Sequence, residues 1–185
     1  MGSSYTSVTL VGTKLDQVRE VAIGPAYLAE SDGVVVVFSE ADDSGNLSGP
    51  SLSGALGCVA LTTTVFDDDV LMISVHTSGE PVGELGIPDP MAMFGDVDLG
   101  AGEAPFEDGT ALDAAALVAA VGRGDVAQVQ TAFAKEYVFA SERHQDVVAA
   151  LGLPSAAVAW GYRYLTEDRE HYTGPALIAV GGAPD

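Results

Sequence analysis

Residues 58–77, CVALTTTVFDDDVLMISVHT, contain the pattern that decides the fold. Two runs rich in Val, Ile, Leu and Thr flank three consecutive aspartates. β-Branched residues favour strands, and Asp tolerates the backbone of tight turns. The segment therefore predicts a β-hairpin whose turn is Asp67-Asp68-Asp69. A metal ion held by the three acids is the alternative, but the sequence shows no nearby histidine or fourth ligand, and we favour the turn.

Strand-like and helix-like runs alternate upstream of this hairpin. Residues 7–12 predict a strand and residues 14–23 a helix. Two strands follow around residues 31–33, and the four consecutive valines at 34–37 indicate a central strand that is buried on both faces. A short helix over 50–57 then leads into the hairpin, and an edge strand over 82–87 follows it.

The resulting order, β-α-β-β-α-β, is that of a ferredoxin-like split βαβ unit with a hairpin added. We therefore expect an α+β protein, with an antiparallel or mixed sheet and two helices in residues 1–94. An acidic, Gly- and Pro-rich linker follows at 95–109. Residues 110–185 form a helical unit with a C-terminal tail, and we expect both units to pack together as one co-folding domain.

Capping residues and glycines divide the second half into four predicted helices, at 114–121, 126–141, 142–152 and 156–165. The tail at 174–182 either adds a strand to a sheet edge or lies against the surface. The last two helices have the rhythm of a helix-turn-helix motif. The second of them, however, begins with Ser and Ala where a DNA-binding protein needs Arg, Asn, Gln or Lys. We expect a packed helical pair, with Trp160 set into a core.

The formal net charge is −20, and no Lys or Arg occurs between Arg19 and Arg123. Such a field repels nucleic acid and anionic lipid, and it attracts cations or basic proteins. We therefore expect no nucleic-acid or membrane partner. An acidic or halophilic proteome, in which surface charge serves solubility alone, is the alternative explanation.

Cys58 is the only cysteine, which excludes an internal disulfide and fits a reducing, cytoplasmic compartment. No apolar run is long enough to span a membrane, and no signal peptide is visible. Motifs for nucleotide binding and for an activated nucleophile are missing too, so we expect no cofactor. The sequence leans towards a protein that is not an enzyme.

Residues 40–51, EADDSGNLSGPS, approach the spacing of a calcium loop. Their oxygen-bearing side chains fall at positions one, three, five and seven, as Glu40, Asp42, Ser44 and Asn46. The twelfth position is Ser51, where such a loop needs a bidentate carboxylate, and a strand precedes the loop instead of a helix. The stretch therefore predicts a solvated surface loop, with weak calcium binding as the alternative.

The three histidines, His76, His144 and His171, show no metal-ligand spacing. His144 lies on the apolar stripe of its predicted helix, as a core histidine would, yet Glu142 and Asp146 place polar chemistry beside it. Glu142 and His144, with His76 as a further candidate, are the best candidate catalytic residues. They would serve a small hydrolase or transferase.

Two segments resemble a group of bacterial hypothetical proteins. Residues 52–82 resemble its LG-x-x-AL…DDDVL…GE-V segment, and residues 137–165 resemble its F-x-x-ERH…LGLP…GYRYL segment. The resemblance covers about residues 50–166 and carries no assigned activity. It implies a single folding unit and transfers no catalytic residue. The chain departs from the group at residues 85–95, LGIPDPMAMFG, where an aromatic-rich segment is usual.

Charge and the missing catalytic motifs together favour a non-enzymatic binding module for a basic protein partner. An immunity- or antitoxin-like role would be one instance, because a basic toxin would be steered by this field. The rival hypotheses are the small hydrolase or transferase at Glu142 and His144, and calcium binding at 40–51.

Overall fold

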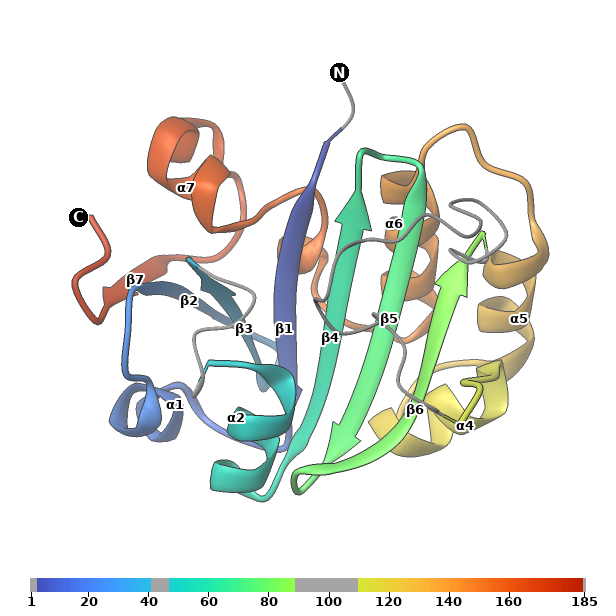
Figure 1. The fold of residues 1–185 in the computed structure, drawn as a ribbon, viewed down its shortest axis with the longest axis horizontal. Coiled ribbons are helices and arrows are strands. Elements are labelled where there is room, and N and C mark those ends of the chain that lie inside the picture. Colours follow the sequence, from blue (N-terminus) through green and yellow to red (C-terminus); the bar gives the residue numbers. More distant parts are fainter. Residues whose placement is uncertain (1–2, 41–46, 89–109, 185) are drawn as a thin grey trace, which may run out of the picture.

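The computed structural model of the chain describes residues 3–40, 47–88 and 110–184. Its strands form one antiparallel sheet in the order β6-β5-β4-β1-β3-β2-β7 (Figure 1). The strands are β1 (Tyr5–Val11), β2 (Ala26–Ser31), β3 (Val34–Ser39), β4 (Val59–Phe66), β5 (Val70–Thr77), β6 (Glu80–Ile87) and β7 (Leu177–Val180). The predicted α+β class is confirmed, and the sheet is antiparallel throughout its described part.

The first half has the predicted split βαβ arrangement. Helix α1 (Leu15–Val21) joins β1 to β2, and β3 lies between these two strands in the sheet. Helix α2 (Gly49–Leu56) joins β3 to β4 and ends at Gly57, whose φ of 61° is the left-handed backbone that glycine adopts without strain. Both helices pack on the same apolar cluster, which they share with β1, β2 and β3.

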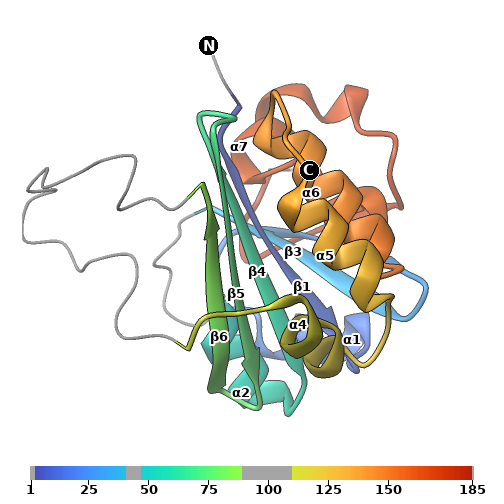
Figure 2. The same cartoon turned by 90° about the vertical axis from the view of Figure 1, so that its right-hand side faces the viewer.

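A second layer of helices covers the other face of the sheet (Figure 2). It consists of α4 (Ala114–Val121), α5 (Val126–Ala134) and α6 (Ala140–Ala150). Leu117 and Val147 from this layer share one core cluster with Leu61 and Ile73 from β4 and β5. Burial of this shared apolar surface stabilises the contact between the helices and the hairpin. Within the described ranges, no helix combines the length and the apolar character needed to cross a bilayer.

Two predicted strands occupy distinct places in the sheet. The valines at 34–37 are fully buried in β3, as predicted for a strand covered on both faces. The tail adds β7 to the edge of the sheet, antiparallel to β2, so the strand alternative holds for the tail. The predicted linker at 95–109 lies outside the described residues.

The second half departs from prediction at two helices. The helix predicted over 126–141 ends at Ala134, and residues 135–139 form a connection before α6. The helix predicted over 156–165 is broken: a short 3-10 turn (Ser155–Ala157) precedes a bend, and α7 (Tyr162–Asp168) follows. The break falls at Ala159, whose φ is 64°, and the chain then passes so close to β1 that a Cβ at Gly161 would lie 3.0 Å from the Cβ of Tyr5. The helix-turn-helix pattern therefore does not form.

Candidate functional site

The Asp67-Asp68-Asp69 stretch forms the predicted turn between β4 and β5. Asp67 and Asp68 have φ angles of 49° and 60°, the left-handed values that a tight hairpin turn requires. The Asp69 N–H donates to the Phe66 carbonyl at 3.0 Å and closes the turn. Asp tolerates this backbone better than most residues, which explains two of the three acids without a metal.

Asp68 also ties the turn to the helical layer. Its carbonyl accepts from the Ala140 N–H at 2.7 Å, and its carboxylate Oδ1 accepts from the Ser141 N–H at 3.0 Å. Helix α6 begins here, and its own N-cap residue, Phe139, supplies no side-chain cap. A carboxylate from the hairpin therefore caps a helix that follows it by some seventy residues, and it fixes the turn against residues 138–141.

Side chains of α6 hold the connection between α5 and α6, residues 135–139, in place. Asp146 accepts hydrogen bonds from the Tyr137 hydroxyl at 2.6 Å and from Lys135 Nζ at 3.0 Å. These two bonds hold the pKa of the Asp146 carboxyl below its usual range. Arg143 donates to the Lys135 carbonyl at 2.9 Å and lies over the Tyr137 ring. These contacts brace the connection against α6.

Large apolar side chains are exposed around this turn. Phe66, Val138 and Phe139 are 52%, 79% and 50% exposed, and the chain flanking the Asp68–Ala140 contact carries all three. Phe66 projects from the face of β4 opposite its neighbour Val65, which faces the helical layer. Phe139 is the residue that precedes α6 in the helical layer. We call Phe66, Asp67, Asp69, Val138 and Phe139 the turn-end surface.

This surface is acidic as well as apolar. Asp67 and Asp69 are exposed, and Glu40 lines a hollow of about 340 Å³ together with Phe66. Arg163 lines the same hollow, but its guanidinium is paired with Glu167 at 3.0 Å. Asp69 and Glu40 have no salt bridge to a Lys or Arg of the described chain. An exposed apolar patch rimmed by charge is typical of a protein-binding surface.

His144 lies directly beneath the turn and is sealed in the core at 1% exposure. Its Nδ1 lies 2.9 Å from the Tyr5 hydroxyl oxygen, with which it shares a hydrogen bond, and the two rings stack at 5.8 Å. Burial lowers the pKa of His144 to about 3, so the imidazole is neutral at pH 7. Glu142 is exposed on the outer side of the same helix. The structure therefore does not place these two candidates in a common cleft.

His76 lies on the other face of the sheet from His144. It alternates with Val75, which faces the helical layer, so its side chain projects towards the α2 side. Its buried Nδ1 has no hydrogen-bond partner in the described chain, and burial lowers its pKa. Glu84 on β6, directly opposite Ser74, has a buried Oε2 without a partner there, and burial raises its pKa. The structure therefore does not bring the three candidates together: Glu142 is exposed, His144 is in the core, and His76 is on the other face of the sheet.

The calcium-loop candidates fall mostly outside the described residues. Asp42, Ser44 and Asn46 belong to the part that the structure does not describe, and Glu40 is exposed where β3 has ended. Ser48 N-caps α2 by accepting from the Ser51 N–H at 3.4 Å. In the described ranges, no three His, Cys, Asp or Glu side chains lie close enough together to hold a metal ion.

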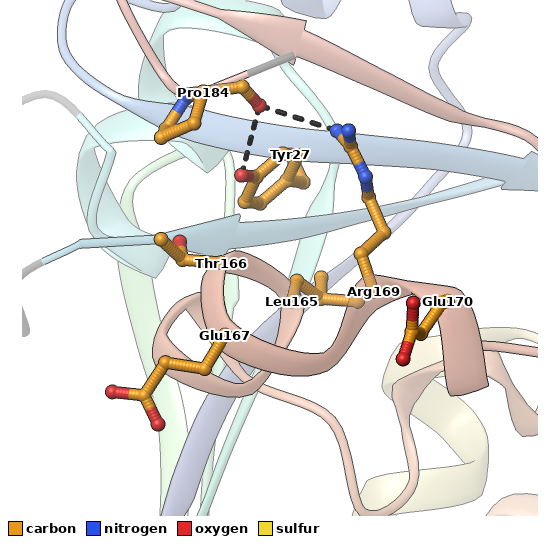
Figure 3. A pocket seen from close by; sticks show the side chains of 7 residues that line it. All are labelled: Tyr27, Leu165, Thr166, Glu167, Arg169, Glu170 and Pro184. Atoms are coloured by element: carbon orange, nitrogen blue, oxygen red, sulfur yellow. Dashed lines mark hydrogen bonds between the residues drawn. The ribbon is translucent and has the colours of Figure 1, made fainter.

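Hollows surround α7 as well. The one in Figure 3 measures about 420 Å³ and lies between α7, β2 and the C-terminal tail. The Tyr27 hydroxyl and Arg169 Nη1 both donate to the Pro184 carbonyl, at 2.9 and 3.2 Å, and the Thr166 hydroxyl donates to the Tyr162 carbonyl at 3.0 Å. The Glu167 side chain extends away from that carbonyl (Figure 3). The two bonds to Pro184 hold the tail against this hollow.

Sequence reasoning missed the turn-end surface. The predicted helix over 126–141 included Val138 and Phe139, and Phe66 was placed at the end of a predicted strand. The sequence gives no signal that separates an apolar side chain on a helix from one on an exposed connection. The aspartates were predicted to form a turn, and the cap that Asp68 supplies to α6 depends on a contact over 73 residues of separation.

Comparisons with protein-family models, with curated proteins and with solved structures find no match to this chain.

Proposed function

We propose that the protein is a non-enzymatic binding module that docks a basic protein partner on the turn-end surface. One observation carries this proposal: exposed apolar rings and exposed carboxylates flank a turn whose backbone is fixed by hydrogen bonds. Binding energy in protein interfaces concentrates in a few aromatic anchors, with charged residues at the rim. Because the connection is already braced, little conformational entropy is lost on docking.

The charge distribution favours a positively charged partner. Residues 20–122 contain 18 acidic residues and no Lys or Arg, whereas the rest of the chain contains nine acidic residues and all seven basic ones. The net charge is therefore −18 in that segment and −2 elsewhere. Glu40, Asp67 and Asp69 belong to the acidic segment. A basic partner would be steered towards it, and an immunity- or antitoxin-like role is one instance of such binding.

The cysteine content and the charge also indicate where the protein acts and which partners we exclude. A cytoplasmic location fits the single Cys58, a buried thiol without a disulfide. Nucleic acid and anionic membranes would be repelled by the acidic segment. Basic proteins remain the class of macromolecule that this surface complements.

The anchors can be tested with short synthetic peptides rich in Lys, Arg and aliphatic residues, titrated by calorimetry at low salt. Phe139→Ser should weaken binding about thirtyfold, the loss expected for one aromatic anchor. Ile23→Ser is the matched control, because Ile23 is 76% exposed and lies far along the chain from the turn. Equal affinities for these two variants would contradict the proposed docking surface.

To test whether charge acts locally at the turn-end surface, two variants with the same net charge are compared. Asp69→Lys and Glu30→Lys both change the net charge from −20 to −18, and both sites are exposed. Asp69→Lys should weaken peptide binding several-fold more than Glu30→Lys, since only Asp69 adjoins the anchors. If the two variants lose the same affinity, the attraction comes from overall charge and the surface has no specific role.

A further inference from the structure

A third hollow beside α7 has a different chemical character from the other two. It measures about 320 Å³, at the small end of the range for ligand pockets. Its lining consists of Ser3, Ala159, Trp160, Tyr164, Asp168 and His171. It adjoins the turn-end surface, because the Ser3 carbonyl accepts from the Asp68 N–H at 2.8 Å. We call it the Trp160 hollow.

The two aromatic walls of the Trp160 hollow are held in place by neighbours. Trp160 meets the Tyr172 ring edge-on, with centroids 5.3 Å apart and planes at 83°. The Tyr164 hydroxyl accepts from the Ser4 N–H at 3.3 Å. Since both rings have contacts that fix their orientation, a ligand would meet a preformed aromatic wall.

The backbone at the hollow is strained. Ala159 has a φ of 64°, a left-handed value that non-glycine residues rarely adopt. This bend separates the 3-10 turn from α7 and directs Trp160 into the lining. Strained residues of this kind are found disproportionately at ligand clamps and other functional sites.

The charged side chains that line this hollow differ from those of its two neighbours. Arg163 lines the hollow beside Phe66, and Arg169 lines the one in Figure 3. The Trp160 hollow has neither a Lys nor an Arg in its described lining, and its one carboxylate, Asp168, forms no salt bridge within the described residues. A carboxylate beside two electron-rich rings favours a cation, because the negative face of an aromatic ring attracts positive charge.

We propose that the Trp160 hollow binds an organic cation, an alkylammonium or guanidinium group, between Trp160, Tyr164 and Asp168. Indole is the strongest cation–π partner among the side chains, and the carboxylate neutralises the bound charge. The cation comes either from a Lys or Arg side chain of the partner or from a free amine. The first source rests on the proposed function, and the second does not.

Trp160 is the only tryptophan of the chain, so its fluorescence reports on this hollow directly. Titration with n-butylammonium should change the emission saturably, and butan-1-ol, its neutral counterpart, should not. Asp168→Asn should weaken n-butylammonium binding at least fivefold, and a Trp160→Leu variant followed by calorimetry about five- to thirtyfold. Glu170→Gln is the control for Asp168→Asn, because it removes the same charge two residues away, from the hollow in Figure 3.

A saturable response to butan-1-ol equal to that of the amine would overturn the proposal, and so would equal effects of Asp168→Asn and Glu170→Gln. The two sources are separated by comparing n-butylammonium with a Lys-containing peptide from the calorimetric series. Tighter binding of the peptide, lost in Phe139→Ser, identifies a partner side chain, and equal or weaker binding identifies a free amine. If Asp168→Asn changes neither titration while Phe139→Ser still weakens peptide binding, the cation site fails and the docking surface stands.

Discussion

The two sides of the Asp67–Asp69 turn use their residues in opposite ways. On the inner side, His144 and Tyr5 share a hydrogen bond in the core, and burial lowers the pKa of the imidazole to about 3. On the outer side, Phe66 and Phe139 are half exposed although their chemistry suits a core. The comparison teaches that a residue's chemical type does not decide its role. Here the titratable group is structural, and the apolar groups form the candidate binding surface.

This contrast has a physical origin in the hydrogen bonds of Asp68. By capping α6, Asp68 joins the turn to residues 140 and 141, one turn of helix before the buried His144. The same contact holds the ends of β4 and α6 in place, where Phe66 and Phe139 project into solvent. Substitutions on the inner side should therefore change stability, and substitutions on the outer side should change binding.

The largest effect is expected from His144→Ala. The change removes a fully buried ring and leaves the Tyr5 hydroxyl without its partner, so the free energy of unfolding should fall by about 3 to 5 kcal/mol. Chemical denaturation gives this value directly. Glu142→Ala, at an exposed site on the same helix, should change it by no more than about 0.5 kcal/mol. A His144→Ala protein of unchanged stability would break the comparison and reopen a catalytic role.

The next effect is a loss of stability in acid. Burial lowers the pKa of His144 in the folded state to about 3, below its ordinary value of 6.5, so the unfolded chain binds the proton first. The free energy of unfolding is therefore unaffected by this group above pH 6.5 and falls as the pH drops towards 3. Between pH 8 and pH 5 the loss amounts to about 2 kcal/mol.

Denaturation curves at a series of pH values check this sign and size. Burial also lowers the pKa of His76, so that residue contributes a loss in the same direction. His144→Asn should lower stability at pH 8 yet show a clearly flatter pH dependence, whereas His76→Asn should keep most of the slope. A His144→Asn protein with an unchanged slope would show that another group accounts for the acid sensitivity.

A smaller effect on stability should distinguish Asp68 from Asp69. Asp68→Ala removes the cap of α6 and should cost about 1 kcal/mol of stability, measured by thermal or chemical unfolding. Asp69→Ala, at an exposed site without that bond, should stay within about 0.5 kcal/mol of the wild type. In peptide binding the ranking should invert at low salt, with Asp69→Ala weakening affinity. Equal stability losses would mean that the cap contributes nothing.

Much of the fold could be predicted from the sequence. Alternating strand patterns and the four valines at 34–37 predicted the central sheet, because a strand buried on both faces leaves that composition. The capping-box spacing of Thr110 and Asp113, and Asp125 before the next apolar run, likewise predicted helices there; Asp113 itself and Asp125 are the caps of α4 and α5. These signals are local, so a single sequence contains them.

The candidate site depends on contacts that no local pattern encodes. Residues 135–139 continue the apolar spacing of α5, yet bonds from α6 hold them as a connection, and Gly161 interrupts the last predicted helix because the chain passes close to β1. Asp68 capping α6 depends on distant segments meeting. His144 could be placed on an apolar stripe from sequence, but its partner, Tyr5, is 139 residues away.

The most direct test of the account is a residue-by-residue map of peptide binding on the folded protein. Backbone amide NMR shifts, recorded as a Lys- and Arg-rich peptide is added, locate its contacts. The account predicts that the largest shifts fall on residues 66–69 and 138–141 and that added salt reduces them. Shifts spread evenly over the acidic residues of the whole chain, or centred on α1 and α2, would contradict the turn-end surface as the docking site.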